Sequence, residues 1–460
     1  MGTSEVRYPL CSITATVAGP RARLAGKHRS GSNPTSLRVL RYPCGSTGVV
    51  HGRGITVWLI VAALFLWASS GSSQSVDTSR TAKGGVTHVA TQTGMTVYIG
   101  GDFSRVGSVA SGGAPVNSES GKAVRPFPKV NGHVYAAVSD GSGGWFVGGN
   151  FRAIAGRRPN ALAHIMRDGS VAAWDPHVSP PPGGPSDVTA LAVSGNTVYF
   201  GGYFAKIGGQ NRPGIGAVDA TTGAATEWNP VLTADEARVD AIAVSGNTVY
   251  VGGRFAKIGG QARSGIAALD ATTGAATAWN PNATGDDSRV RGLVVSGRTV
   301  YVGGSFTNIG GQPRKGIASL DVSTGVASGW NPSADGEVGA LAVSGNTIYV
   351  GGHFSHIGGQ PRTDLAALDA TTAAATEWNP DPGGDIHALA VSGNVIYAGG
   401  EFRKMGGKPR HYVAALDVAT GIVTDWNPAA GGSPLSLDTG RIVRTIAVAP
   451  VQFGPTEAPR

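Results

Sequence analysis

The residues with the widest chemical range occupy variable positions of a repeated motif. A Gly-Gly-x-Phe unit occurs seven times, and the residue at x differs each time. A core position would not vary between acidic, basic and aromatic side chains, so we expect these residues to face solvent or a central channel. A second variable position follows each phenylalanine by two residues. From these two positions we take the expected binding residues to be Asp102, Asn150, Tyr203, Arg254, His353, His356, Glu401, Lys206, Lys257 and Lys404.

His353 and His356 are three residues apart and could join Glu401 of the next repeat as metal ligands. Imidazole and carboxylate groups are ligands that zinc accepts. No other repeat carries this histidine pair, and the sequence brings no third histidine to it. We therefore expect two surface histidines and no metal site.

Acidic residues gather in the segments between repeats, where their oxygens could hold calcium. They are Asp235, Glu236, Asp286, Asp287, Asp335, Glu337 and Asp385. Their spacing differs from the D-x-D-x-D-G pattern of a known calcium loop. We expect no cofactor, and calcium stays open as the alternative.

The sequence contains none of the common catalytic signatures. A nucleophile elbow, an HExxH pair, a phosphate-binding loop and a dinucleotide fingerprint are all missing. Both cysteines, Cys11 and Cys44, precede the repeats. The repeated part therefore has no thiol for a disulfide, a thiolate metal site or covalent catalysis, and we expect no catalytic residue.

The elements that must position the variable residues repeat with the motif. The seven phenylalanines are spaced by 48, 53, 51, 51, 48 and 48 residues, and a Trp-Asn-Pro or Trp-Asp-Pro marker ends six units. One unit divides into four short strands, Val239–Val244, Thr248–Val251, Gly265–Leu269 and Ala275–Trp279. Four strands in about 40–50 residues are typical of a propeller blade, with the aromatic residues in the core between blades. We predict an all-β fold, a seven-bladed β-propeller of four-stranded antiparallel blades.

Alternating strand directions decide which loops share a face. The Ser-Gly-Asn-Thr and Asp-Ala-Thr-Thr-Gly turns should meet on one face, and the loops after strand two and between blades on the other. Only the second set varies in length and chemistry, and binding residues concentrate in variable loops on a rigid scaffold. We therefore place the binding site on that second face.

An arginine recurs seven residues before an aspartate in five repeats. A ring of five cations could bind a polyanion, but a position that is constant among repeats usually serves the repeat fold. We predict that each arginine pins its loop to a strand end by hydrogen bonds. The five are Arg212, Arg263, Arg314, Arg362 and Arg410.

The positive charge of the chain lies almost entirely before the repeats. Residues 1–70 hold eight basic residues and one acid, whereas the other 390 residues hold 29 basic and 28 acidic residues. The net charge of +8 is therefore no sign of a nucleic-acid partner, and we expect none.

An uncharged apolar run, Ile55–Trp67, follows the basic segment. It is shorter than the roughly 17–25 residues of a transmembrane helix and matches the apolar core of a signal peptide, with an uncleaved anchor as the alternative. We expect a basic leader that is disordered or precedes the true start, a signal and cleavage zone, a linker, the propeller and a tail. Their ranges are 1–54, 55–74, 75–85, 86–450 and 451–460. After cleavage the protein would be secreted or held at the cell envelope, without a membrane span.

One unit in full, VSGNTVYVGGxFxxIGGQxRxxIAALDATTGxxxxWNP, resembles the bacterial delta-60 repeat β-propellers over residues 86–450. The likeness is strong in repeats three to seven. The first two repeats depart from it, since Met95 replaces the asparagine of the first turn, and Val116-Asn117-Ser118 and Met166-Arg167-Asp168 replace Leu-Asp-Ala. The diglycine is also similar to kelch repeats, and the Asp-x-x-Thr-Gly pattern is similar to quinoprotein blades. The resemblance implies an exported propeller and no particular activity.

The sequence favours a binding or scaffolding module over an enzyme. We expect a monomer that recognises a protein or glycan through the variable-loop face. The alternative is an extracytoplasmic hydrolase, lactonase or quinone-dependent oxidoreductase with its site at the channel mouth. Convergence of His, Asp and Glu side chains there would favour the enzyme, and a flat rim of mixed charge would favour binding. The C-terminal segment Val443–Val448 resembles a further first strand, and we predict that it pairs near the first blade.

Overall fold

The structure of the chain is a computed structural model. It describes residues 84–93, 96–103, 112–124, 126–157, 160–233 and 237–428, without the side chains of 84–93, 102 and 103. The expected leader, signal zone, tail and closing strand Val443–Val448 lie outside these residues. In the described part of the chain there is no helix with the length and hydropathy to cross a membrane.

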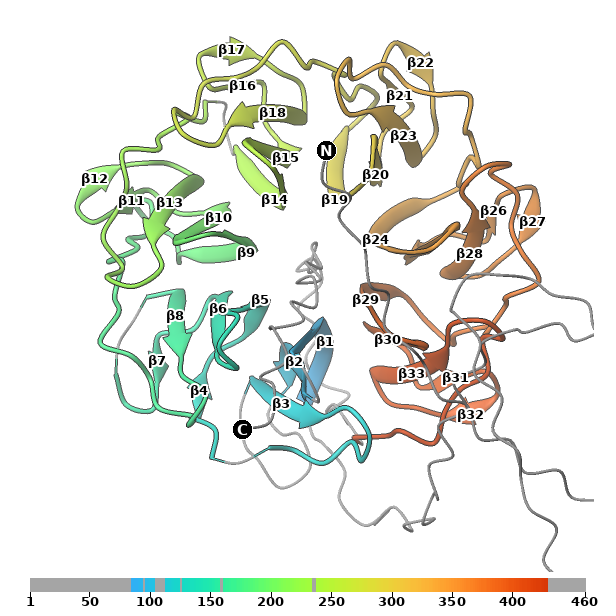
Figure 1. The fold of residues 1–460 in the computed structure, drawn as a ribbon, viewed down its shortest axis with the longest axis horizontal. Coiled ribbons are helices and arrows are strands. Elements are labelled where there is room, and N and C mark those ends of the chain that lie inside the picture. The colour runs from blue at the N-terminus through green and yellow to red at the C-terminus, as the bar shows by residue number, and fades with distance from the viewer. Residues whose placement is uncertain are drawn as a thin grey trace, which may run out of the picture. The chain divides into compact units, whose positions relative to one another are not determined.

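The described residues are all-β and form seven three-stranded antiparallel sheets, one for each repeat. In each sheet the first strand lies nearest the common centre and the third lies farther out (Figure 1). From the centre outwards, the strands are β1 (Gly84–Thr93), β2 (Thr96–Phe103) and β3 (Gly113–Asn117); β5 (Val134–Ser139), β6 (Trp145–Gly149) and β8 (Leu162–Ile165); β9 (Asp187–Ser194), β10 (Thr197–Tyr203) and β13 (Ile215–Asp219); β14 (Arg238–Ser245), β15 (Thr248–Arg254) and β18 (Ile266–Asp270); β19 (Arg289–Ser296), β20 (Thr299–Ser305) and β23 (Ile317–Asp321); β24 (Glu337–Ser344), β25 (Thr347–His353) and β28 (Leu365–Asp369); and β29 (Ile386–Ser392), β30 (Val395–Gly400) and β33 (Val413–Asp417).

The fourth strand predicted for each blade is present as a single antiparallel β-bridge. In the β14–β15–β18 sheet this bridge joins Leu269 to Ala276, and equivalent bridges occur in the other six sheets. The second strand is longer than predicted, because β15 continues through its paired glycines to Arg254. A Cβ atom on Gly252 would lie 2.4 Å from Val290 of the next sheet, so this position must be glycine for the two sheets to approach.

A short strand pair that the repeat pattern did not predict lies in the loop after the second strand of each of the last five repeats, and in the second repeat such a pair joins this loop to the segment before the first strand. These pairs are β4 (Val130–Asn131) with β7 (Ala153–Ile154), β11 (Lys206–Ile207) with β12 (Gln210–Asn211), β16 (Lys257–Ile258) with β17 (Gln261–Ala262), β21 (Asn308–Ile309) with β22 (Gln312–Pro313), β26 (His356–Ile357) with β27 (Gln360–Pro361), and β31 (Lys404–Met405) with β32 (Lys408–Pro409). Gly259 and Gly260 turn one of them with φ values of 59° and 81°, the left-handed conformation that a two-residue hairpin turn needs. Figure 1 shows the hairpins from β11–β12 to β31–β32 at the outer edge.

Neighbouring sheets pack through a repeated pair of aromatic residues. Trp279 Nε1 donates a hydrogen bond to the carbonyl of Asp321 in the next sheet at 2.9 Å. Tyr250 packs edge-on against Trp279, with ring centroids 5.2 Å apart, and its hydroxyl donates to the carbonyl of Val322. Phe306 of the next sheet belongs to the same buried cluster. The prediction that these aromatic residues form the core between blades is confirmed.

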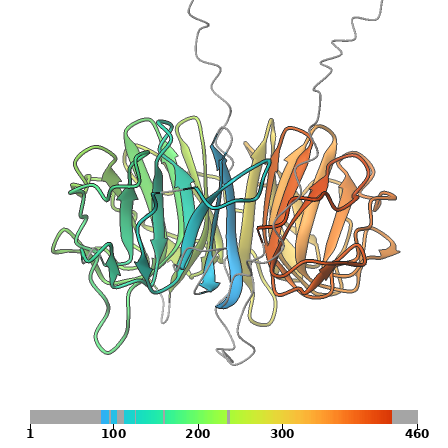
Figure 2. The same cartoon turned by 90° about the horizontal axis from the view of Figure 1, so that it is seen from below.

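The first sheet packs between the second sheet and the last one. β1 contacts both β5 and β29, and Figure 2 shows it standing between the green and orange sheets. Trp426 Nε1 donates to the carbonyl of Asn117 at 2.9 Å, and Tyr397 OH donates to the carbonyl of Ser118 at 3.3 Å. The last sheet thus makes with the first sheet the same two bonds that link consecutive sheets elsewhere.

The recurrent arginines make the hydrogen bonds that the sequence predicted. Arg263 Nη2 donates to the carbonyl of Thr277 at 2.6 Å, which ties the outer hairpin loop to the segment before the tryptophan. Arg314, Arg362 and Arg410 make the equivalent bonds to the carbonyls of Ser328, Thr376 and Thr424, and Arg212 donates to the carbonyl of Trp228 itself. The prediction that these arginines tie their loops to the blade by hydrogen bonds is confirmed.

The second sheet carries a carboxylate whose ionisation should affect stability. Burial acts to raise the pKa of Asp140, but hydrogen bonds from His164, Ser142 and Gly144 outweigh it and lower the pKa to about 2. A carboxyl group with a lowered folded-state pKa stabilises the fold above its unfolded pKa, and that stabilisation is lost as the pH falls.

We expect Asp140→Asn to lower the free energy of unfolding at neutral pH by about 1–2 kcal/mol, after allowance for solvent screening in this partly exposed turn. The difference from the parent should shrink between about pH 4 and about pH 2. Urea unfolding at several pH values measures it. A difference that stays constant with pH would contradict the assignment.

Candidate functional site at the channel end

The residue before each repeated phenylalanine lies at the same end of its sheet as the start of the inner strand. Tyr203 pairs with Asp187, Arg254 with Arg238, and His353 with Glu337. This register places the variable residues beside the loops between blades, as the sequence predicted. We call this end the channel-end face. It comprises the first residues of β9, β14, β19, β24 and β29 and the last residues of β10, β15, β20 and β25.

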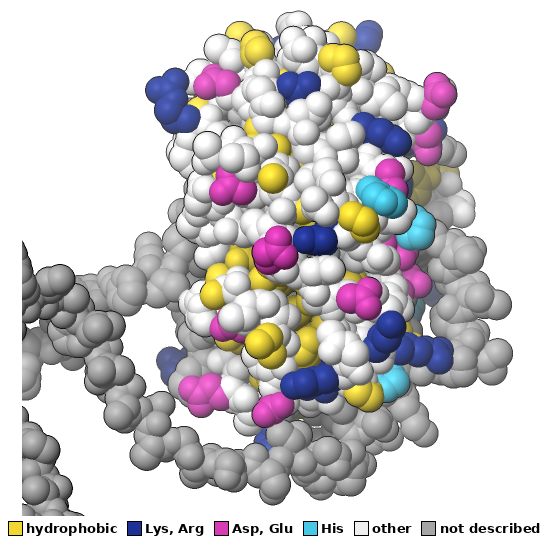
Figure 3. Space-filling view, turned by 90° about the vertical axis from the view of Figure 1, so that its right-hand side faces the viewer, with side chains coloured by type: hydrophobic (Ala, Val, Ile, Leu, Met, Phe, Trp, Pro, Cys, Tyr) yellow, Lys and Arg dark blue, Asp and Glu magenta, His cyan; other side chains and the backbone are white. Residues whose placement is uncertain are grey.

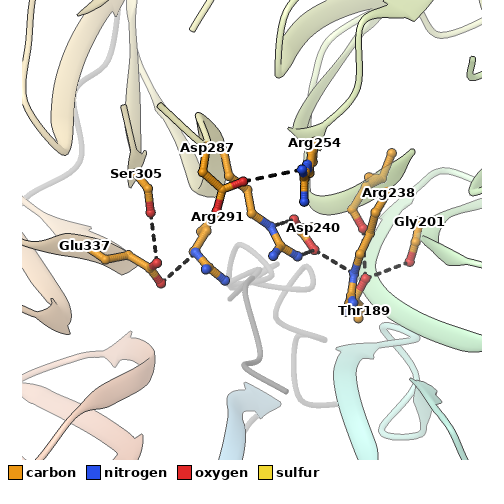
Figure 4. Close-up of polar contacts among 11 residues, drawn as sticks. Thr189, Gly201, Arg238, Asp240, Arg254, Asp287, Arg291, Ser305 and Glu337 are labelled. Carbon is orange, nitrogen blue, oxygen red and sulfur yellow. Dashed lines mark hydrogen bonds and ion pairs between the residues drawn. The ribbon is translucent and has the colours of Figure 1, made fainter. Parts of the chain in front are cut away.

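A buried carboxylate organises the charges on this face (Figure 4). The Asp240 side chain is fully buried. Arg289 of the next sheet donates to both of its oxygens, with Nη2 at 2.8 Å from Oδ1. Arg238 Nε lies 3.0 Å from Oδ1 as a second cation. One carboxylate therefore holds two guanidinium groups, and two neighbouring sheets are joined through it.

Arg291 carries a guanidinium group that this network satisfies only in part. Its Nε lies 2.6 Å from Glu337 Oε1, and Ser305 Oγ donates to the other oxygen of that carboxylate. The Arg291 side chain is 12% exposed, and its Nη1 has no hydrogen-bond partner within the described residues. Burial lowers the pKa of Arg291, Glu337 opposes this, and repulsion from Arg289 adds to it.

A pocket of 320 Å³ opens beside this network. Arg254 and Asp287 line it together with Ser264 and Ser288. Arg254 Nη2 lies 3.6 Å from Asp287 Oδ1, and both side chains are more than half exposed. The pocket thus offers charged and hydroxyl groups to a polar ligand.

A second group of side chains converges between the last two sheets. Ligand atoms of His353, Asp364 and Asp385 all lie within 4.8 Å of one another. His353 Nδ1 is 2.9 Å from Asp385 Oδ1, and this hydrogen bond raises the pKa of His353. Burial raises the pKa of Asp364, and the charge of Asp385 adds to the effect. Figure 3 shows histidine side chains beside acidic ones on this side of the molecule.

The predicted pairing of His353, His356 and Glu401 does not form. His356 Nδ1 lies 3.1 Å from Asp335 Oδ2, within its own loop. Hydrogen bonds from His356 and Ser355 hold the pKa of Asp335 well below its usual value, although burial opposes them. Glu401 instead contacts His387, with Oε1 and Nε2 3.2 Å apart.

The other expected binding residues do not come together. The Asp102 side chain lies outside the described residues. Asn150 accepts a hydrogen bond from the backbone of His133, and Tyr203 is partly exposed. The three lysines occupy three separate outer hairpins, at β11, β16 and β31, away from the inner strands: Lys206, Lys257 and Lys404.

Comparisons with known proteins assign no family. No known family and no curated protein matches the sequence. Among solved structures, the chain is similar to the computationally designed Ika8 protein, with 18% identity, a TM-score of 0.45, and 75% of this chain and 87% of that one covered. It is also similar to the WD40 β-propeller domain of Doa1, with 11% identity, a TM-score of 0.43, and 64% and 83% covered. At these scores neither likeness carries an argument about a ligand.

Sequence reasoning missed the charged residues inside the strands. Arg238, Asp240, Arg289 and Arg291 occur at the first and third positions of strands that otherwise read as apolar. The available signal was the charge at the third position, where Asp240 and Arg291 stand in place of Thr189 and Gly339 of other repeats. Asp364 carried a similar signal, because Gly214, Gly265 and Gly316 occupy its place in three other repeats.

Proposed function

We propose that this chain is an exported, closed seven-bladed β-propeller, a monomer that binds an acidic group of a protein or glycan at its channel-end face. The seven sheets and the bonds from Trp426 and Tyr397 to the first sheet support closure. The repeat motif supports kinship with the delta-60 repeat propellers. The apolar run Ile55–Trp67 supports export.

The guanidinium of Arg291 is the observation that carries the binding proposal. A largely buried donor without a partner costs about 1–3 kcal/mol, so a protein gains when a ligand satisfies it. Figure 4 shows Arg291 between Glu337 and Asp240. A ligand carboxylate there would accept from Nη1 and would complete the bonding of this cation.

The charges around Arg291 also favour an anion. Four arginines meet three carboxylates in the network drawn in Figure 4, with Arg254, Arg238, Arg289 and Arg291 against Asp240, Asp287 and Glu337. The seven side chains together carry one net positive charge. Low-dielectric surroundings strengthen the attraction of such a charge for an acidic ligand.

We expect Arg291→Gln to weaken binding of an acidic ligand by about 10- to 100-fold, the value of one hydrogen bond to a charged group. Suitable probes are an oligogalacturonate and a glutamate-rich peptide, measured by calorimetry on the full chain. The probe that binds identifies the glycan or the protein class. Binding should weaken as salt rises, because the interaction is electrostatic.

Arg298→Gln is the matched control for this experiment. Arg298 is an exposed arginine in the turn at the opposite end of the β19–β20 hairpin, so its removal changes the net charge equally. It should leave the affinity unchanged. Equal losses in both variants, or binding of neither probe by the parent, would reject Arg291 as the anion site.

An enzyme is the second candidate, and one observation favours it. His353, Asp364 and Asp385 converge near the channel end, which is the arrangement that would favour catalysis over simple binding. Hydrolysis of a lactone or ester by the parent that is lost when Asp385 is substituted would support this candidate. A mixed-charge rim elsewhere on the face favours binding.

A further inference from the structure

The group of His353, Asp364 and Asp385 brings an imidazole and two carboxylates to one point. All three ligand atoms lie within 4.8 Å of one another, and His353 Nδ1 and Asp385 Oδ1 are only 2.9 Å apart. Ligand atoms bound to one zinc ion at about 2.0–2.2 Å are separated by roughly 3–3.5 Å. Small side-chain rotations would therefore place all three on a single ion.

Asp364 distinguishes this group from a cluster of exposed surface residues, because its side chain is buried. It is 6% exposed, and only one of its carboxylate oxygens accepts a hydrogen bond, from the backbone of Phe354 at 3.0 Å. Its other oxygen accepts none from the described residues. A largely buried carboxylate beside a second carboxylate is repelled by it, and a bound cation would remove that repulsion.

The backbone at Asp364 shows that this residue is not required by the repeat. Its φ is +58°, in the left-handed region that favours glycine. Gly214, Gly265 and Gly316 occupy the equivalent position, and each donates its backbone N–H to its own repeated phenylalanine as Asp364 does. Those three repeats fold without a carboxylate there, so accepting a bond from Phe354 does not explain Asp364.

We propose that His353, Asp364 and Asp385 bind a divalent first-row transition cation, for which Zn²⁺ is the probe. Two carboxylates and a neutral imidazole match the charge of such an ion. The imidazole selects against Ca²⁺ and Mg²⁺, which take oxygen ligands. The sequence led us to expect no metal, because it brought no third histidine to His353 and His356; the geometry instead joins His353 to two aspartates. The site shares no residue with the Arg291 network, although His353 pairs in register with Glu337, so variants of Asp364 and of Arg291 test the two proposals separately.

Calorimetric titration of the metal-free full chain with Zn²⁺ tests the proposal. The parent should bind one ion at this site, and Asp364→Asn should weaken that binding by at least about ten-fold. Asparagine keeps an acceptor for Phe354 and removes the charge. Asp364→Gly restores the residue of three other repeats, so it should abolish the site while its metal-free melting temperature is at or above that of the parent.

His356→Gln is the matched control, since this neighbouring histidine pairs with Asp335 outside the group. It should bind Zn²⁺ as the parent does. Co²⁺ should give visible absorption bands in the parent that His353→Gln removes. Absence of Zn²⁺ binding, equal affinity in the parent and both Asp364 variants, or tighter binding of Ca²⁺ than of Zn²⁺ would each overturn the assignment.

Discussion

Replacing Asp240 with alanine should lower the free energy of unfolding by about 3–5 kcal/mol, the loss expected when one partner of a buried ion pair is removed. The Asp240 side chain is fully buried, and both Arg238 and Arg289 depend on it. Without the carboxylate, two largely buried guanidinium groups would repel each other. Because the two arginines come from β14 and β19, the repulsion would act directly on the packing of two sheets. Urea unfolding of parent and variant measures the loss.

Asp240→Asn should fall between the parent and the alanine variant, since an amide oxygen can still accept from Arg289 but carries no charge. Asp425→Ala is the control for a carboxylate in an ion pair. Asp425 is 97% exposed and lies 3.8 Å from Lys408, so its loss should leave unfolding unchanged. If Asp240→Ala behaved like Asp425→Ala, the buried network would not stabilise the fold.

The repeated part of the fold could be predicted because each blade repeats the same turn sequences and the same pattern of apolar residues. A turn of Ser-Gly-Asn-Thr between apolar strands predicts a hairpin, and the observed β14–β15 pair turns there. A tryptophan at one fixed place in each unit indicates a contact that every blade repeats, and Trp279 makes it. The local strand and turn propensities agree with the repeat pattern, so these elements could be predicted without tertiary information.

The sequence analysis did not predict the outer hairpins, because it interpreted their turn residues as loop. As a result it placed the lysines of these hairpins in the binding site. Ile-Gly-Gly-Gln was read as loop, although Gly259 and Gly260 form the left-handed turn of β16–β17. The β16–β17 pair carries Lys257 to the outer edge of the molecule, whereas Arg254, at the end of β15, stays on the channel-end face. These two residues, three apart in sequence, therefore do not share a surface.

The charged network could not be predicted, because its partners are far apart in the chain. Arg289 and Asp240 are 49 residues apart and meet only when neighbouring sheets stand side by side. The same is true of Asp364 and Asp385, which adjoin through the packing of the last two sheets. Sequence spacing within a repeat identifies residues on one blade, whereas both candidate sites are built across two blades.

Replacing Trp426 with alanine should cost about 3–5 kcal/mol in the free energy of unfolding, as expected for a large buried aromatic residue. Trp426 is 5% exposed, packs edge-on against Tyr397, and donates to Asn117 in the first sheet. Its loss would leave a cavity between the two sheets that are farthest apart in the sequence. Trp426→Phe should cost less, because it keeps most of the apolar area and loses the hydrogen bond, worth about 1 kcal/mol.

Trp279→Ala makes this experiment a test of closure. Trp279 is also buried, also packs edge-on against a tyrosine, and also donates a hydrogen bond to a carbonyl of the neighbouring sheet. Its two sheets, however, are consecutive in the chain. In a closed ring the two alanine variants should lose similar stability, since every interface must be intact for the ring to close. In an open arc the Trp426 interface would be absent and its substitution would cost much less. Equal losses would therefore support seven blades joined end to end, and a loss confined to Trp279 would reject that arrangement.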